Sequence, residues 1–219
     1  MTAAGGVQET RSEVPSWRLL ATLGGAGAIV GLCIVLIYEW TLPGIEAHKE
    51  GVLRAAIAEV LHAPERCDTL YLQGNTLSAT RPVGDAAKTA ERVFLGYGPG
   101  GKPSGYAITT SRTGFAEPIV LIFGYDATAH RMLGMKILTS KETPGIADKI
   151  EKPVFTEQFA GVVAPLSGVK GKKGDGPGEI LMITGATISS RAVIRAINEA
   201  ITRWQPLLDA YDGTQRGRL

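Results

Sequence analysis

The sequence predicts an α+β protein: one N-terminal membrane-spanning helix, then a domain in which helices flank an antiparallel sheet. Residues 19–38 form an apolar run without a charged side chain. Residues 68–140 contain several strand-like segments separated by turn signals, and helical patterns precede and follow this series. Strands that follow one another, instead of alternating with helices, favour an α+β arrangement over a parallel βαβ sheet.

The apolar run is typical of a membrane anchor, which we place at residues 17–41. At about 1.5 Å per residue, a helix over residues 19–38 crosses the ~30 Å hydrocarbon core of a bilayer. Trp17 and Arg18 at one end, and Tyr38 and Trp40 at the other, suit the two interfaces. The positive-inside rule slightly favours a cytoplasmic N-terminus, so residues 1–16 are expected to be a disordered cytoplasmic tail.

The anchor is expected to end at Leu42-Pro43-Gly44, because proline interrupts a helix. A separate linker helix is expected over residues 42–64, with apolar residues at steps of three and four, and Pro64 ends it. Residues 65–219 are then expected to form the extramembrane domain.

Six strands are predicted in this domain, because β-branched and aromatic residues gather between turn signals. They are expected at residues 69–72, 76–80, 92–95, 105–110, 119–125 and 132–138. Residues 126–131 are expected to close a hairpin, and residues 153–159 to form a short helix. A last helix should present one apolar face from Val193 to Trp204 and should end at Pro206.

Composition excludes several classes of function. The net charge of +2 is spread along the chain, so nothing predicts nucleic-acid binding. Cys33 lies in the apolar run and Cys67 in a polar stretch, so no disulfide or cysteine cluster is expected. The chain has no C-x-x-C-H motif for a c-type haem, and its three histidines are scattered, so no metal site is predicted.

A glycine-rich segment imitates two nucleotide-binding motifs. Residues 96–101 match G-x-G-x-x-G, and residues 96–102 match the start of a phosphate-binding loop. Both motifs require a helix immediately afterwards. Because Lys102 is followed by Pro103 and a strand-like segment, we predict a loop here and no nucleotide site.

A hydroxyl-rich turn, residues 184–191, lies between a strand-like run at 179–183 and the last helix. A helix N-terminus presents unpaired N–H groups and a partial positive charge, which favour an anion such as phosphate. The alternative is an ordinary helix cap, with Ser189 or Ser190 as the capping residue. These residues alone favour the cap.

A second motif, Glu142-Thr143-Pro144-Gly145, opens a turn that a short helical segment follows. Proline holds Thr143 extended, and Pro144-Gly145 suits a type II turn. Taken alone, this segment favours a surface turn.

Together, the two motifs in this order behind one span resemble the covalent-FMN G subunit of the Rnf electron-transport complexes. The chain is similar also to the C subunit of the sodium-pumping NADH:quinone reductase. In that family a flavin transferase attaches FMN by a phosphoester bond to the last threonine of the second motif, which is Thr187 here. The resemblance implies that Gly185 and Ala186 leave room for the flavin beside the backbone.

The other residues that the resemblance places around the flavin form two groups. Those expected to line the isoalloxazine ring are Glu142, Thr143 and Ile146, and those expected on the phosphate side are Thr184, Ser189 and Ser190. The resemblance assigns no residue as a general acid or base. Two positions depart from the family: Leu181 stands where aspartate is usual, and Ala147 where glycine is commoner.

The resemblance implies an electron-transfer subunit, not catalytic by itself, of a membrane complex that couples electron transport to ion translocation. Its partners would be the other subunits and the flavin transferase, and its C-terminal domain would lie on the periplasmic side of the bacterial inner membrane. One alternative is the FMN subunit of a sodium-pumping NADH:quinone reductase or an extracellular flavin reductase. The other alternative is a flavin-free anchored assembly protein, which Leu181 favours.

Overall fold

The computed structural model describes residues 15–84, 89–142, 145, 147–172 and 176–216 of the chain. It divides into two compact units, residues 1–50 and residues 51–219. The expected site residues Thr143 and Ile146 lie outside the described residues.

The first helix, α1 (Ser16–Val60), is continuous through Pro43, so the expected break at Leu42-Pro43-Gly44 is wrong. Proline costs a helix about 3 kcal/mol through one lost hydrogen bond and a steric clash. Helix-forming residues continue on both sides of Pro43, and propagation of a helix that already exists costs little. An 18-residue window of α1 has a mean hydropathy of 2.4 and no buried residue, so α1 is long and apolar enough to cross a membrane.

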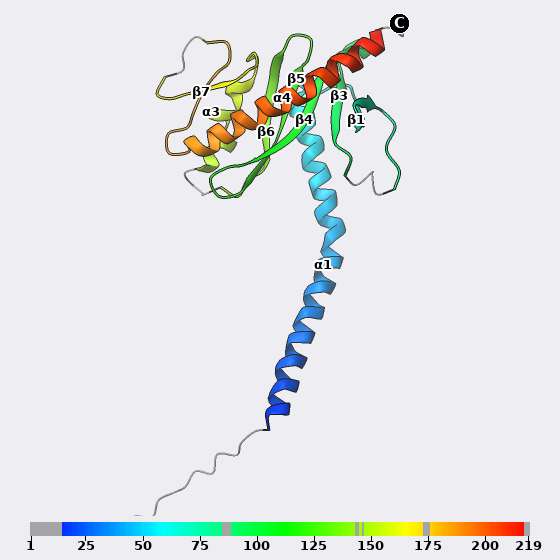
Figure 1. Ribbon diagram of the computed structural model, residues 1–219, viewed down its shortest axis with the longest axis vertical. Coiled ribbons are helices and arrows are strands. Elements are labelled where there is room, and N and C mark those ends of the chain that lie inside the picture. Colours follow the sequence, from blue (N-terminus) through cyan, green and yellow to red (C-terminus); the bar gives the residue numbers. More distant parts are fainter. Residues whose placement is uncertain (1–14, 85–88, 143–144, 146, 173–175, 217–219) are drawn as a thin grey trace, which may run out of the picture. The chain divides into compact units, whose positions relative to one another are not determined.

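An antiparallel sheet forms the centre of the second unit (Figure 1). All six predicted strands are present in it. The strands are β1 (Arg66–Gln73), β2 (Thr76–Ser78), β3 (Arg92–Tyr97), β4 (Pro103–Thr113), β5 (Pro118–Asp126) and β6 (Arg131–Thr139). Their order in the sheet is β2-β1-β3-β4-β5-β6. The expected hairpin is confirmed, because β5 pairs with β6 and Asp126 pairs with Arg131.

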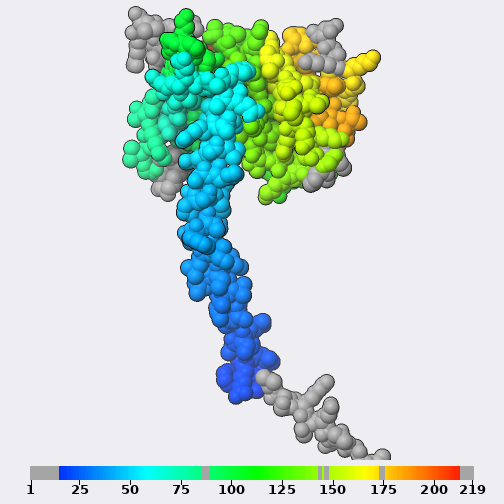
Figure 2. Space-filling view, turned by 180° about the vertical axis from the view of Figure 1, so that it is seen from behind, coloured from blue at the N-terminus to red at the C-terminus, as the bar shows by residue number. Residues whose placement is uncertain are grey.

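The two faces of this sheet carry different residues of the same strands, as period-two alternation requires. On one face, Val93, Leu95 and Ile108 join the larger core cluster with residues of α4 (Thr187–Arg216). On the other face, Phe94 and Ala107 join a smaller cluster with the last turns of α1. Figure 2 shows this end of α1, in cyan, lying against the green strands.

The apolar face predicted for the last helix is confirmed, because Val193, Ile197 and Trp204 are buried against the sheet. Pro206 does not end this helix, which continues to Arg216, so that expectation is wrong. Beyond the proline, Leu208 is fully buried and Tyr106 donates a hydrogen bond to Asp212. A buried leucine contributes about 1.5–3 kcal/mol, which offsets most of the proline penalty.

Smaller elements fill the segments between the sheet and α4. The turn η1 (Pro99–Gly101) leads directly into β4, so no helix follows the glycine-rich segment and no phosphate-binding loop forms. The predicted helix at 153–159 is present as α3 (Pro153–Thr156) and η3 (Glu157–Phe159), preceded by η2 (Ala147–Glu151). Two short parallel strands, β7 (Ser167–Val169) and β8 (Glu179–Leu181), lead towards α4.

Candidate functional site

The strand that enters the hydroxyl-rich turn, β8, pairs with β7 and also binds an amide side chain. Gln158 of η3 accepts a hydrogen bond from the Leu181 backbone N–H at 2.8 Å and donates one to the Leu181 carbonyl at 3.3 Å. The backbone of Leu181 is therefore fixed, while its side chain is half-buried. In the family that the sequence resembles, aspartate is expected at the position of Leu181.

A tight turn follows, in which the Ala186 N–H donates to the Ile183 carbonyl at 3.0 Å. Gly185 has a φ of 87°, in the left-handed region where a side chain is strained. Glycine is therefore required here by the backbone conformation, whether or not a ligand approaches. Thr184 and Gly185 are exposed, whereas Ala186 is buried.

Ser190 closes this turn onto the helix. Its buried Oγ donates to the Ala186 carbonyl at 2.9 Å and accepts from the Ile183 N–H at 3.1 Å. The helix begins at Thr187, so Ser189 and Ser190 lie within its first turn and neither is the residue before the helix. The alternative of an ordinary cap at Ser189 or Ser190 is therefore wrong, because the helix begins two residues before Ser189, and both hydroxyls make other hydrogen bonds.

Ser189 uses its hydroxyl to bind the first residue of the other motif. Its Oγ donates to Glu142 Oε2 at 2.8 Å, and both side chains are buried. Glu142 Oε1 accepts from the backbone N–H groups of Phe115 at 2.9 Å and Ala116 at 3.3 Å. One carboxylate thus joins three segments that are distant in sequence: the β4–β5 turn, the residues after β6 and the start of α4.

Hydrogen-bond donors surround the side-chain oxygens of Glu142. Its oxygens accept two backbone hydrogen bonds and one hydroxyl hydrogen bond, and the positive end of the α4 dipole is adjacent. Gly114 makes room for it, because a Cβ at this position would lie 2.2 Å from Glu142 Oε1. The resemblance to the Rnf G subunit placed Glu142 beside a ligand, whereas the motif alone favoured a surface turn. Gly114 and Phe115 were not identified, because they lie in a turn without a recognisable motif.

Thr187 is the first residue of α4 and is half-buried. Among the described residues, its hydroxyl makes no hydrogen bond. Because the helix starts here, the N–H groups of residues 187–189 have no acceptor inside the helix. A free hydroxyl, unpaired N–H groups and the helix dipole together can hold a phosphate group. By the chemistry of its donors, this site fits a phosphate ester.

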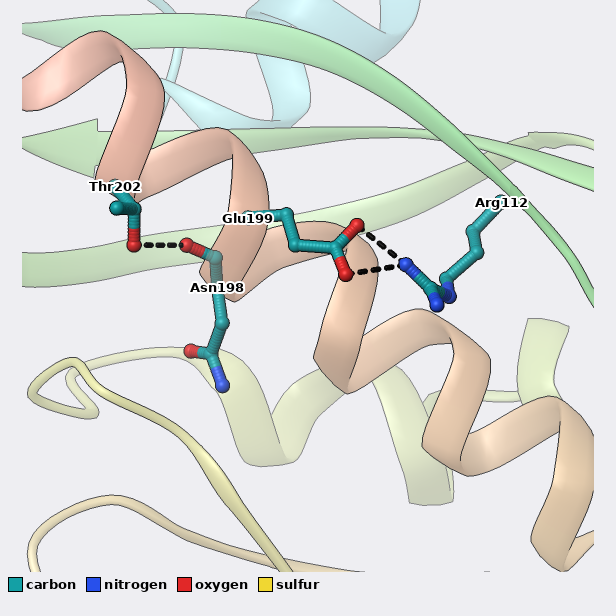
Figure 3. Close-up of polar contacts among 4 residues, drawn as sticks. All are labelled: Arg112, Asn198, Glu199 and Thr202. Atoms are coloured by element: carbon teal, nitrogen blue, oxygen red, sulfur yellow. Dashed lines mark hydrogen bonds and ion pairs between the residues drawn. The ribbon is translucent and has the colours of Figure 1, made fainter.

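A separate cavity of about 520 Å³ lies further along α4, against β3 and β4. Its walls carry Glu91, Glu199 and Arg203, among others, and none of the motif residues. Ion pairs join Arg203 to Glu91 and Arg112 to Glu199, the second of which is drawn in Figure 3. These pairs tie α4 to the sheet at exposed positions, where an ion pair contributes about 1 kcal/mol or less.

Within the described part of the chain, no group of three or more histidine, cysteine or acidic residues is arranged so that it could hold a metal ion.

Comparison with known proteins gives the family. Residues 114–202 match the FMN-binding domain family. The chain is 36% identical over 209 residues to the G subunit of the Na(+)-translocating ferredoxin:NAD(+) oxidoreductase complex of Acetobacterium woodii, covering 91% of this chain and 99% of that protein. This chain belongs to the Rnf G-subunit family.

A second member of the Rnf G-subunit family is the G subunit of the ion-translocating oxidoreductase complex of Cereibacter sphaeroides. It is 32% identical over 187 residues, covering 82% of this chain and 80% of that protein. The predicted resemblance is therefore confirmed at the level of the family.

Two solved structures share the fold of this Rnf G-type chain. The crystal structure of Shewanella oneidensis NqrC matches with a TM-score of 0.65 and 18% identity, covering 75% of this chain and 99% of that one. The C subunit of the Na(+)-translocating NADH-quinone reductase from Parabacteroides distasonis matches with a TM-score of 0.52 and 23% identity, covering 66% and 78%. The predicted α+β fold, with its antiparallel sheet and flanking helices, is confirmed.

Proposed function

We propose that this chain is the FMN-carrying electron-transfer subunit of an Rnf-type membrane complex that couples electron transport to ion translocation. Family membership supports the role, since the relatives are named as subunits of ion-translocating oxidoreductase complexes. The oxidoreductase activity belongs to the assembled complex, and the other subunits are this chain's partners. FMN supplies the redox chemistry, while the protein holds and orients it.

We propose that FMN is joined through its phosphate to Thr187 Oγ1, by a phosphoester bond that a flavin transferase makes. The observation that carries this proposal is the free Thr187 hydroxyl at the first residue of α4, within the T-G-A-T motif. Thr184 and Gly185 are exposed beside it, and the buried Ala186 and Ser190 fix the turn. The unpaired N–H groups of the first turn bind the phosphate charge.

Glu142 and Ser189 hold this site together through their hydrogen bond. We propose that this bond keeps Glu142, the first residue of the E-T-P-G motif, against the start of α4. Thr143 and Ile146, in the same loop, are proposed to line the isoalloxazine ring.

Intact mass tests the attachment. Full-length chain co-expressed with the flavin transferase is expected to carry one FMN adduct, and the denatured protein should fluoresce in a gel. Thr187→Ala should lose both signals, while Thr187→Ser should retain a fraction because it keeps a hydroxyl. Thr202→Ala, an exposed threonine further along α4, is the matched control and should keep the full adduct. An adduct of unchanged mass on Thr187→Ala would contradict the assignment, and a wild-type chain without an adduct would support the flavin-free alternative.

We propose further that residues 65–219 lie on the periplasmic side of the membrane. Cys67 is exposed near the start of this segment, whereas Cys33 lies within the apolar part of α1. A membrane-impermeant maleimide should therefore label Cys67 in intact spheroplasts, and Cys67→Ala should abolish the labelling. Labelling that occurs only after the cells are lysed would place the domain in the cytoplasm.

A further inference from the structure

Two arginines on the exposed side of α4 have no ion-pair partner among the described residues. Arg191 and Arg195 are exposed and lie four residues apart, about one helical turn. Further along the same helix, Glu199 is paired with Arg112 (Figure 3). The charge of Glu199 is therefore neutralised within the chain, whereas the charges of Arg191 and Arg195 are not.

The position of these two arginines is unfavourable for α4 taken alone. Like charges four residues apart repel each other across a helical turn. The start of a helix also carries partial positive charge, and the first turn of α4 has no acidic residue. A phosphate ester at Thr187 would offset only part of this positive charge. Because neither arginine pairs with a described acidic residue, the arrangement indicates an anionic group from outside the chain.

The strand β7 brings a third cation to the same end of α4. Leu166, just before β7, exchanges two hydrogen bonds with Asn198, and a Cβ on Gly168 would lie 3.1 Å from Ile194 Cδ1. The strand therefore runs towards the start of α4. Lys170 follows β7 and, at about 3.3 Å per residue, lies level with the first turns of the helix. It is exposed, and no ion pair joins it to a described residue.

An exposed apolar side chain adjoins the cations. Ile188 is 54% exposed and precedes Arg191 by three residues and Arg195 by seven, so the three share one side of α4. An apolar centre with a charged rim is typical of protein–protein interfaces. Ile188 also follows Thr187 directly, so this surface begins beside the proposed attachment atom. A protein that exchanges electrons with a cofactor has to approach it, and such encounters use small surfaces that charge steers.

We propose that Arg191, Arg195 and Lys170, with Ile188 beside them, form the surface on which an acidic patch of another subunit of the complex docks. This inference rests on the proposed attachment of FMN to Thr187, which makes this end of the domain the one that a redox partner approaches. The contact is non-covalent. Carboxylates of the partner offset the charges of the two arginines, since a guanidinium group binds a carboxylate through two parallel hydrogen bonds.

Cross-linking in the assembled complex tests the docking surface. Intact mass of the full-length chain first shows whether the adduct is present, and this measurement tests the attachment separately. A water-soluble carbodiimide then joins amines to carboxylates that touch them. Arg191→Lys and Arg195→Lys keep the charge and supply the amine, and mass spectrometry should find each position joined to an aspartate or glutamate of another subunit. Arg81→Lys, at an exposed position after β2, is the matched control and should give no such product.

Affinity gives the second measurement. Full-length flavinylated chain in detergent is titrated into complex purified from cells that lack the chain, and restored electron-transfer activity reports binding. For the double variant Arg191→Gln with Arg195→Gln, we expect the Kd at low salt to rise about tenfold, the change for two lost charge pairs at an exposed interface. Because salt screens such pairs, the Kd of the wild type should approach that of the variant as salt rises. Arg81→Gln should bind as the wild type does.

Three outcomes would overturn the docking surface. The first is a wild-type Kd in the double variant with no cross-link from either position to another subunit. The second is an unchanged Kd with weaker binding of the double variant to phosphatidylglycerol vesicles, which assigns the surface to anionic lipid. The third is loss of the adduct from Arg191→Gln, which assigns Arg191 to flavin attachment. A wild-type chain without an adduct would instead refute the attachment at Thr187, the premise of this inference.

Discussion

At the scale of single residues, the site depends on how one carboxylate is accommodated. Glu142 is 6% exposed and accepts hydrogen bonds from Phe115, Ala116 and Ser189. Its position requires the absence of a side chain at Gly114. Glu142, the first residue of the E-T-P-G motif, therefore has a structural function, the joining of three segments.

The substitution Gly114→Ala tests whether the Glu142 side chain needs the space that glycine leaves at position 114. The new Cβ would lie 2.2 Å from Glu142 Oε1 and 2.6 Å from Ile119 Cδ1, so the carboxylate has to move and its three hydrogen bonds weaken. We expect the free energy of unfolding of the full chain, measured by urea titration in detergent, to fall by about 1–3 kcal/mol. Gly98→Ala is the control, because its Cβ would meet no atom closer than 3.8 Å. Equal stability of Gly114→Ala and wild type would show that Glu142 relocates without cost.

At the scale of the elements, α4 is attached to the rest of the domain by side-chain amides as well as by its apolar face. Asn198 accepts from the Leu166 N–H at 2.8 Å and donates to the Leu166 carbonyl at 2.8 Å. Gln205 contacts Tyr125 and the Ala127 carbonyl. Asn198 and Gln205 are seven residues apart, so both amides lie on nearly the same side of α4 and hold the middle of the helix in place.

Asn198→Ala should therefore loosen α4 from the segment before β7. Leu166 is 5% exposed, so removal of the amide leaves its N–H and carbonyl buried without partners. Unpaired buried groups cost about 1–3 kcal/mol each, and we expect a loss of about 2 kcal/mol in urea titration. Thr202→Ala, which removes one exposed hydrogen bond to the Asn198 carbonyl (Figure 3), is expected to change stability by less than about 0.5 kcal/mol. An equally large loss of unfolding free energy in Thr202→Ala would contradict this prediction, because it would show that substitutions on α4 destabilise the helix without involving Leu166.

The end of α1 packs on the other face of the sheet because β5 has a glycine there. A Cβ on Gly124 would lie 2.2 Å from the Val60 carbonyl oxygen. Gly124→Ala should displace the last turn of α1 from Phe94, Ala107 and Ile122, and lower the free energy of unfolding by about 1–3 kcal/mol. Gly134→Ala on the paired strand β6 is the matched control, because its nearest contact, Val60 Cα, is 4.0 Å away. Hydrogen exchange of residues 51–60 reports the displacement directly, and unchanged protection there would contradict it.

At the scale of the whole second unit, residues 51–219, stability is expected to depend on alkaline pH through tyrosines between the sheet and α4. Burial, together with the nearby carboxylates of Asp209 and Asp126, raises the pKa of Tyr125 from a usual 10 to about 12. Burial and Asp212 also raise the pKa of Tyr106 above its usual value. The neutral forms are therefore favoured in the folded state.

The sign of the effect follows from linkage. Below pH 10 both the folded and unfolded states hold the Tyr125 proton, and its contribution to stability is complete. Between pH 10 and about 12 the unfolded state loses the proton first, so stability falls as pH rises. Urea titrations across this range should show a shallower fall for Tyr125→Phe than for the wild type. Identical slopes would show that Tyr125 ionises equally in both states. The variant should also lose some stability at pH 7, because it lacks the hydrogen bond to Gln205.

The sequence by itself determined the apolar anchor, the six strands, the apolar face of α4 and the two motifs, because each depends on a local pattern. Periodicity identifies strands and helices, and T-G-A-T and E-T-P-G are contiguous. The sequence-based predictions were wrong at Pro43 and Pro206, where proline was expected to end a helix. Both helices continue, because further helical residues or buried side chains such as Leu208 offset the free-energy cost of the proline. The predictions also placed the possible cap at Ser189 or Ser190, whereas α4 begins at Thr187.

Only the tertiary structure decided what joins the two motifs. The hydrogen bond from Ser189 to Glu142 connects residues far apart in the sequence, and no local pattern encodes such a pair. The same holds for Phe115, which enters the site through its backbone N–H, a group that every residue except proline carries. Local sequence patterns thus identify candidate residues of the site, and the packing of α4 against the sheet determines which of them are in contact.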